Sequence, residues 1–121
     1  MAHQRLEHAI VIGGSIAGLL ATKVVSKIFN RITLIDRDPL PLSPQPRRGV
    51  PQSVQPHVLF TRGFQIMEQH FPGLGESLVA AGAVTIDWGR EFHFFSLGDW
   101  NATFEGESQL KSVTCSRYLL E

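Results

Sequence analysis

Apolar and polar residues follow one another in short blocks over the first third of the chain. Residues 9–12 form a continuous apolar run with β-branched side chains, which predicts a buried strand of a parallel sheet. A helix is predicted over 16–29, with Asn30 as its left-handed C-cap, and a second strand over 31–35. The helix prediction rests on apolar residues that recur every four positions: Leu20, Val24 and Ile28. Together these blocks predict a βαβ unit.

The middle of the chain changes character. Residues 37–51 hold five prolines, too many for a helix or a central strand, so a long loop is predicted there. Disorder is one interpretation of this loop. Its arginines, which suit phosphate groups through paired donors, favour a binding role instead: Arg37, Arg47 and Arg48. Helices are predicted over 57–71 and 75–82.

The last third of the chain has the period of β-strands. Apolar and polar residues alternate over 83–97, which predicts a strand broken at Gly89 and Arg90. The aromatic residues of this stretch fit either a sheet core or one wall of an apolar substrate pocket. A short strand is predicted over 112–116, followed by the first turn of a helix at 117–121 that Ser116 caps.

These elements predict an α/β fold, namely a Rossmann-like βαβ unit with additional helices and a partial antiparallel β element. A helix that begins at residue 116 has little to pack against, and the sheet edges are open. We therefore expect an incomplete fold, the front part of a larger protein or a module that needs another chain. Its expected parts are a βαβ core at 8–36, a proline- and arginine-rich loop at 37–56, helices over 57–82, strands over 83–115 and a helix start at 116–121.

Composition narrows the function classes. Hydrophobic residues make up 43% and charged residues 18% of the 121 residues, as in soluble globular proteins. Eleven basic and eleven acidic residues cancel, so the charge gives no argument for nucleic acid or an anionic membrane. Cys115 is the single cysteine, which excludes an intrachain disulfide and favours the cytoplasm. The five histidines lie apart, without partners at metal-ligand spacing, so no metal is expected.

A secretory signal is the alternative interpretation of residues 1–25, because basic residues precede an apolar stretch there. Glu7 and Lys23 interrupt that pattern, and no clear cleavage site follows. The apolar run is also too short and too rich in glycine for a membrane span. We therefore expect no membrane span.

The candidate chemistry lies in the turn between the first strand and its helix: Gly13, Gly14, Ser15, Ile16, Ala17 and Gly18. A diphosphate binds where backbone N–H groups and the helix dipole meet at a helix N-terminus. Gly13 suits the tight turn and Gly18 the close packing of helix on strand. Ser15 replaces the usual middle glycine, and its hydroxyl can donate to a phosphate.

Asp36 ends the second predicted strand, eighteen residues beyond Gly18. An acid about 20 residues further on accepts hydrogen bonds from a ribose hydroxyl in dinucleotide-binding units. The spacing therefore favours a nucleotide site. A strand–turn–helix without any ligand remains the alternative.

With these residues noted, the chain resembles the FAD-dependent oxidoreductases of the aromatic-ring hydroxylase superfamily, in particular squalene-epoxidase-like bacterial monooxygenases. Four blocks carry the resemblance: the serine variant of the glycine motif at 11–21, the acid–arginine strand ending at 34–41, the R-x-G-V-P-Q-like segment at 47–52, and the S-R-x-x-L-E helix start at 116–121. The family's H-x-H pair follows the third block. Only its second histidine, His57, is kept, since Gln55 stands in the first place.

The resemblance implies a bound FAD with its ADP half along 13–18 and Asp36 on the adenosine ribose. Arg37, Arg47 and Arg117 would lie near the phosphates or the flavin. It also implies NADH or NADPH as the reductant and an apolar or aromatic small molecule as the substrate. No catalytic residue is assigned. The D-G and G-D motifs of the family are not present, so the resemblance covers an N-terminal FAD-binding part.

Two other functions stay open at this point. One is an NAD-binding dehydrogenase, against which the proline–arginine segment and Arg117 speak. The other is a truncated, non-catalytic module that binds a nucleotide or a partner chain.

Overall fold

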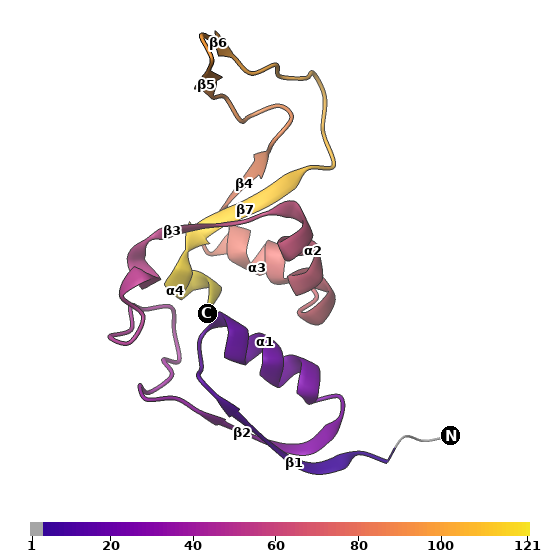
Figure 1. Ribbon diagram of the computed structural model, residues 1–121, viewed down its shortest axis with the longest axis vertical. Coiled ribbons are helices and arrows are strands. Elements are labelled where there is room, and N and C mark those ends of the chain that lie inside the picture. Colours follow the sequence, from indigo (N-terminus) through magenta and orange to yellow (C-terminus); the bar gives the residue numbers. More distant parts are fainter. Residues whose placement is uncertain (1–3) are drawn as a thin grey trace. The chain divides into compact units, whose positions relative to one another are not determined.

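The computed structural model describes residues 4–121 as a mixed α/β protein with several helices and small sheets (Figure 1). The chain divides into two compact units. The first comprises residues up to Gln55 together with Ser116–Glu121, and the second is Pro56–Cys115. No helix within the described range is long and apolar enough to span a bilayer.

The first unit contains the predicted βαβ arrangement. Strand β1 (Leu6–Ile12) pairs in parallel with β2 (Phe29–Ile35), and helix α1 (Ile16–Val25) connects them. The register aligns Ile12 with Ile35 at the carboxyl ends of the strands, and α1 contacts both strands. The turn after β1 and the end of β2 therefore lie at the same edge of this small sheet.

The boundaries of these elements differ from the prediction. Helix α1 ends at Val25 instead of Phe29, because the chain turns at Ser26, whose hydroxyl donates to the Lys23 carbonyl at 2.7 Å. Pairing with β1 then draws residues from Phe29 onward into β2. The prediction of Asn30 as a left-handed C-cap was wrong, since Asn30 lies inside this strand.

The rest of the first unit is mostly irregular. The 37–50 segment forms neither helix nor strand, as the prolines predicted. It leads into a short 3₁₀ helix, η1 (Pro51–Val54), which contacts α4 (Arg117–Leu120). Ser116 precedes α4 as predicted, but its side chain makes no capping hydrogen bond.

The second unit combines a sheet with two helices. Its sheet has the order β3 (Pro56–Leu59), β7 (Lys111–Ser116), β4 (Val84–Asp87), and β4 pairs with β7 in antiparallel fashion. The helices are α2 (Thr61–His70) and α3 (Leu74–Ala80). The buried hydrophobic residues of this unit are Met67, Leu78, Ala83 and Val113.

The predicted helix over 57–71 begins later than expected. His57 lies in strand β3, where its carbonyl accepts a hydrogen bond from the Thr114 hydroxyl at 3.1 Å. The helix starts only at Thr61. Pairing with a strand more than fifty residues away decides this local structure.

Of the strand predicted over 83–97 with a break at Gly89 and Arg90, only Val84–Asp87 and Phe95–Ser96 are strands. Strand β4 ends at Asp87, and the chain turns through the Gly89–Arg90 break that the sequence predicted. Asp87 is buried, and its carboxylate accepts hydrogen bonds from the backbone and the hydroxyl of Ser108 at 2.7 and 2.5 Å. These bonds lower the pKa of Asp87 against the effect of burial, and they hold the turn closed.

A separate hairpin follows, made of β5 (Phe95–Ser96) and β6 (Asp99–Trp100). The Phe95 and Trp100 rings meet edge to face at 5.5 Å, yet both side chains are exposed. The expectation that these aromatics form a sheet core was therefore wrong for the hairpin. The Trp88 and Phe92 rings do pack together, tilted at 4.5 Å, and Phe60 and Phe94 extend their row at either end.

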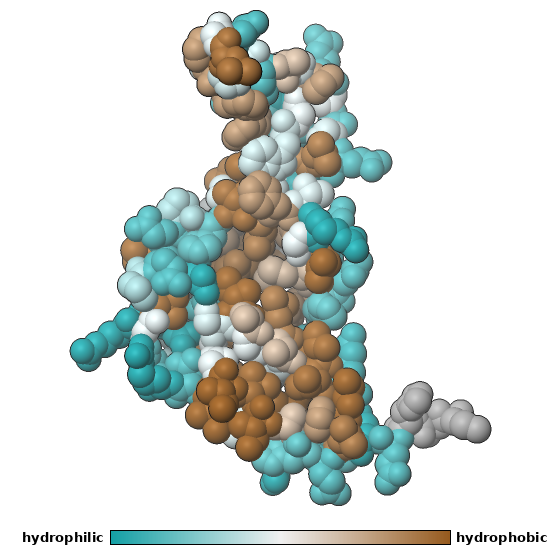
Figure 2. Space-filling model, in the orientation of Figure 1, coloured by the Kyte–Doolittle hydropathy of each residue, from teal (hydrophilic) through white to brown (hydrophobic). Residues whose placement is uncertain are grey.

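Helix α1 is apolar on nearly every side, but none of its residues is buried. Figure 2 shows hydrophobic residues gathered over this helix. Val24 is 42% exposed, and Ile28, just after the helix, is 49% exposed. A helix that is apolar all round is normally covered by other parts of a protein, whereas every residue of α1 keeps part of its surface exposed.

Candidate functional site

The turn between β1 and α1 has the two features that its glycines predict. Gly13 has a φ of +100°, a conformation that favours glycine, and its N–H donates to the Ile35 carbonyl at 2.7 Å. A Cβ on Gly18 would overlap the Gly13 carbonyl group. Both glycines are therefore required by geometry, and α1 starts directly against the end of β1.

The N-terminus of α1 offers free backbone donors. Ser15 is the N-cap with extended backbone (φ −91°), so this position tolerates a side chain. The first intrahelical bond runs from the Leu19 N–H to the Ser15 carbonyl at 2.9 Å. The N–H groups of Ile16, Ala17 and Gly18 precede it and have no intrahelical acceptor, so they can meet an anion.

Asp36 lies beside this turn, as its place at the end of β2 predicted. Its carboxylate accepts hydrogen bonds from the N–H of Gly14 at 2.5 Å and of Asp38 at 2.8 Å, and pairs with Arg47 at 3.0 Å. These backbone bonds, more than the Arg47 guanidinium, lower the pKa of Asp36 although burial opposes them. A carboxylate has about four acceptor positions, so Asp36 keeps room for one hydroxyl donor.

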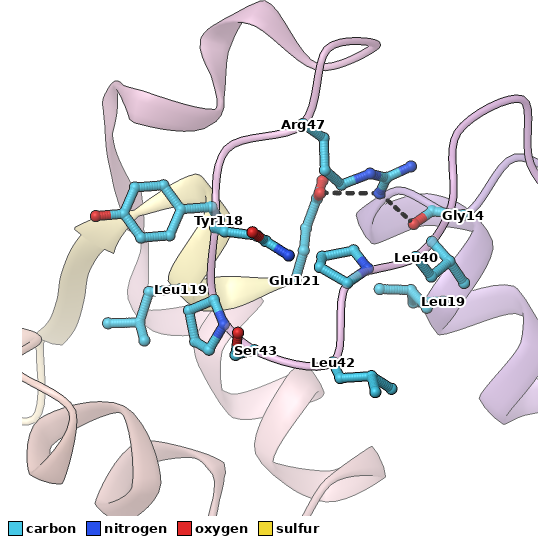
Figure 3. Close-up of a pocket in the computed structure, with 12 residues that line it drawn as sticks. Gly14, Leu19, Leu40, Leu42, Ser43, Arg47, Tyr118, Leu119 and Glu121 are labelled. Carbon is cyan, nitrogen blue, oxygen red and sulfur yellow. Dashed lines mark hydrogen bonds and ion pairs between the residues drawn. The ribbon is translucent and has the colours of Figure 1, made fainter.

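Arg47 connects the turn to two carboxylates. Its side chain is only 6% exposed, and its Nη1 donates to the Gly14 carbonyl at 2.8 Å and to Glu121 at 3.2 Å (Figure 3). Its Nε is buried and has no hydrogen-bond partner. A buried polar atom without a partner is uncommon, and this one leaves a donor free beside the turn.

Glu121 completes a charge cluster of four residues: Asp36, Arg47, Arg117 and Glu121. It accepts hydrogen bonds from the Ser15 hydroxyl at 2.5 Å and from Arg117 Nε at 3.0 Å. Burial by itself would raise the pKa of Glu121. The bonds from Ser15 and Arg117 and the charge of Arg47 outweigh burial and lower the pKa.

The Ser15 hydroxyl is therefore engaged by the protein. It gives its one proton to Glu121 and accepts a hydrogen bond from Arg117 Nη2 at 2.6 Å. The sequence predicted that this hydroxyl donates to a phosphate. In the structure the hydroxyl donates to the Glu121 carboxylate instead.

Two hollows flank the buried Arg47. One, of about 400 Å³, is lined by Gly13, Ser15, Asp36 and Arg37 among others. The other, of about 380 Å³, lies between the 40–45 segment, Leu19 of α1 and residues of α4 (Figure 3). Arg47 lines both, and each volume falls within the range of about 300–1,000 Å³ that small-molecule sites occupy.

Most of the predicted site residues come together here. Gly13, Ser15, Asp36, Arg37 and Arg47 line the first hollow, and Gly14 lines the second. Ile16, Ala17 and Gly18 form the first turn of α1 without lining the first hollow, and Arg117 contacts Ser15.

Arg37 and Glu121 depart from what the sequence indicated. The Arg37 side chain is 78% exposed and pairs with Asp38 at 3.5 Å, so it stands at the rim. Glu121 was not predicted as a site residue. Two signals could have indicated it: the S-R-x-x-L-E block of the resemblance ends on Glu121, and Glu121 follows Arg117 by four residues, the spacing of an ion pair on a helix.

Two other residues considered in the sequence belong to the second unit. His57 belongs to strand β3 and Cys115 to β7. Burial raises the pKa of the Cys115 thiol, which disfavours the reactive thiolate. The described part of the chain contains no group of three or more potential metal ligands.

Comparison with known proteins adds one relative. The chain is 44% identical over 81 residues to "Protein Rv3254" of Mycobacterium tuberculosis (strain ATCC 25618 / H37Rv). The match covers 67% of this chain but only 17% of the length of that protein. No family model matches the chain.

Proposed function

We propose that the first unit is a Rossmann-like unit that binds the ADP half of FAD. The chain would then be the FAD-binding N-terminal part of a flavin-dependent, monooxygenase-like oxidoreductase. One observation carries the proposal: Asp36 and Arg47 meet beside the glycine turn, at the edge where α1 begins. Ligands bind at this edge in parallel α/β sheets because strand ends and helix N-termini converge there.

The residues present fit such a cofactor. The free N–H groups at the start of α1 and the unpartnered Nε of Arg47 suit a diphosphate. Asp36 is ionised, and its remaining acceptor position suits one ribose hydroxyl. Arg37 stands at the rim of the same hollow, where it adds positive charge.

The chemistry that FAD supplies when bound is oxidation and reduction: it takes hydride from NADH or NADPH and activates O₂ toward an apolar or aromatic small molecule. The role of this chain's own residues is to bind and orient the adenosine end. No residue of the chain is proposed as catalytic. A cytoplasmic location is part of the proposal, since the lone Cys115 fits a reducing compartment.

A titration of FAD into the purified chain, followed by flavin fluorescence and melting temperature, tests the proposal. We expect saturable binding with a rise in melting temperature. Arg47→Met keeps the length of the side chain but removes its donors, and should weaken binding roughly tenfold or more. Arg62→Met, at an exposed position of α2 in the second unit, should leave the affinity within about twofold. Absence of FAD binding, or equal affinities of the two variants, would contradict the proposal.

A non-catalytic module that binds a nucleotide or a partner chain is the second candidate. The exposed apolar surface of α1 favours it, because such a surface suits contact with another polypeptide. Parallel titrations with ADP and NAD separate the candidates. A chain that binds ADP as tightly as FAD would support the module, and a preference for NAD would support a dehydrogenase.

A further inference from the structure

Glu121 holds the groups that a diphosphate at this turn would need. Its carboxylate accepts the only hydroxyl proton of Ser15, the N-cap of α1, at 2.5 Å. It also pairs with Arg47 at 3.2 Å and with Arg117 at 3.0 Å. Its side chain is only 5% exposed, so protein groups have replaced water around this carboxylate.

The electrostatics of the charge cluster explain why a carboxylate is held there. Two guanidinium groups, on Arg47 and Arg117, are balanced by two carboxylates, on Asp36 and Glu121. Without Glu121, Arg47 would keep Asp36 as its counter-ion, but Arg117 would lose its partner. The cluster would then carry one unbalanced positive charge, which destabilises a largely buried site. A diphosphate that binds at this balanced cluster adds negative charge to it. The Ser15 hydroxyl cannot donate to that diphosphate while it donates to Glu121.

We propose that Glu121 is a resident counter-anion of the nucleotide site: it occupies Ser15, Arg47 and Arg117 when no nucleotide is bound, and an incoming diphosphate competes with it for them. This inference rests on the proposed function, because it concerns the same site. Arg47 makes the exchange feasible. Its Nε is buried and has no partner in the absence of nucleotide, so it becomes an additional donor to the diphosphate once the Arg47 side chain is released from Glu121.

The competition has a signature that a purely structural ion pair lacks. Removing the charge of Glu121 takes a counter-ion from buried Arg47 and should lower the stability of the nucleotide-free protein. The same change frees Ser15 and leaves the cluster with a net positive charge, which should tighten diphosphate binding. Stability and affinity therefore move in opposite directions. A purely structural role would lower both.

The test compares three proteins of 121 residues: the unmodified chain, Glu121→Gln and Glu7→Gln. Glu7 is an exposed residue of β1, so its variant removes the same charge from the first unit away from the cluster. Inorganic pyrophosphate and FAD are titrated separately by calorimetry, and melting temperatures are measured without ligand. We expect Glu121→Gln to bind pyrophosphate roughly threefold to tenfold more tightly, with a lower melting temperature. Glu7→Gln should match the unmodified chain.

The two ligands distinguish failure of this inference from failure of the proposed function. Tighter pyrophosphate binding by Glu121→Gln without FAD binding by any protein supports the inference and contradicts the FAD proposal. FAD binding with pyrophosphate affinity unchanged or weakened by Glu121→Gln overturns the inference alone. Lack of pyrophosphate binding by every protein also overturns it.

A second measurement needs no variant, in case Glu121→Gln does not fold. Carbon NMR of the glutamate side chains in the unmodified protein follows the Glu121 carboxylate during a pyrophosphate titration. Release from Ser15 and Arg47 should shift the Glu121 signal saturably, while that of Glu7 stays in place. A Glu121 signal that stays fixed while pyrophosphate binds would overturn the inference.

Discussion

At the scale of single residues, Gly18 and Asp36 set the geometry of the turn. Gly18 lets the start of α1 lie against the Gly13 carbonyl, where a Cβ has no room. Asp36 accepts the Gly14 N–H and so ties the turn to the end of β2. The site consequently depends on contacts of a few atoms, each of which one substitution can remove.

Gly18→Ala should destabilise the first unit by about 1–3 kcal/mol, because its methyl group overlaps backbone that cannot rotate away. Chemical denaturation measures the change. Gly63→Ala is the control, since Gly63 lies inside α2 and has no atom within 4 Å of an added Cβ. It should gain about 0.5–1 kcal/mol from helix propensity. Equal effects of the two variants would refute the close packing at Gly18.

Asp36 should give the protein an acid-sensitive component of stability. Hydrogen bonds from the Asp38 and Gly14 N–H groups hold its pKa below the ordinary 3.8. A lowered folded pKa stabilises the protein above pH 3.8, and this contribution is lost as pH falls through the folded value. The melting temperature of Asp36→Asn should therefore fall less steeply below pH 3.8 than that of the unmodified chain.

The control for this comparison is Asp99→Asn, at an exposed position of the β5–β6 hairpin. Its melting temperature should fall with decreasing pH as steeply as that of the unmodified chain. If the melting temperature of Asp36→Asn falls as steeply in acid as that of the unmodified chain, the hydrogen bonds to Asp36 do not favour its charged form.

Sequence patterns predicted the glycine turn and the acid beside it, because the spacing of glycines and of Asp36 reflects local backbone geometry. Gly13, Gly18 and Asp36 stand where their spacing predicted. The bond from Ser15 to Glu121 could not be predicted, since it joins residues 106 positions apart. No local pattern encodes such a contact.

At the scale of elements, the short hairpin β5–β6 carries visible backbone strain. Its two turn residues, Leu97 and Gly98, have φ of +54° and +91°. Positive φ at both positions is normal for a two-residue hairpin turn with asparagine or glycine, but unfavourable for leucine. Leu97 is also fully exposed, so packing does not compensate.

Leu97→Asn should therefore stabilise the hairpin by about 1 kcal/mol, because asparagine accepts this backbone conformation. Thermal denaturation measures the gain. Leu110→Asn replaces another exposed leucine, one whose φ is not positive, and should change stability by less than about 0.5 kcal/mol. A loss of stability in Leu97→Asn would show that the leucine side chain itself supports the hairpin.

Element types were more predictable than their boundaries. The period of four predicted α1, and the proline-rich composition predicted an irregular 37–50 segment. Strand β3 was missed because its residues carry a helix-like pattern and become a strand only by pairing with β7. Tertiary pairing overrides local propensity in such short segments.

At the scale of the whole molecule, the chain returns to its first unit at its end. Residues 116–121 belong with the βαβ unit, where Leu120 is buried and Arg117 and Glu121 reach Ser15. The chain also spans only 17% of the length of its mycobacterial relative. We therefore propose nucleotide binding for this chain and do not attribute the activity of a complete enzyme to it.

A chain shortened to residue 116 should melt several degrees lower than the full chain, because buried Arg47 loses Glu121 and Leu120 no longer packs. Calorimetry measures the transition. A double variant of the 121-residue chain, Arg117→Met with Glu121→Met, separates the two causes, since it keeps the Leu120 contact and removes only the charges. An unchanged transition in the shortened chain would contradict the role of α4 in the first unit.

The most direct test of the central claim is a map of the FAD contacts on the intact chain. Amide nitrogen NMR during an FAD titration reports each backbone N–H separately. The account predicts saturable shifts at the start of α1, at Asp36 and at Arg47, with residues 61–110 of the second unit largely unmoved. Shifts centred on the second unit, or none at the glycine turn at saturating FAD, would contradict it.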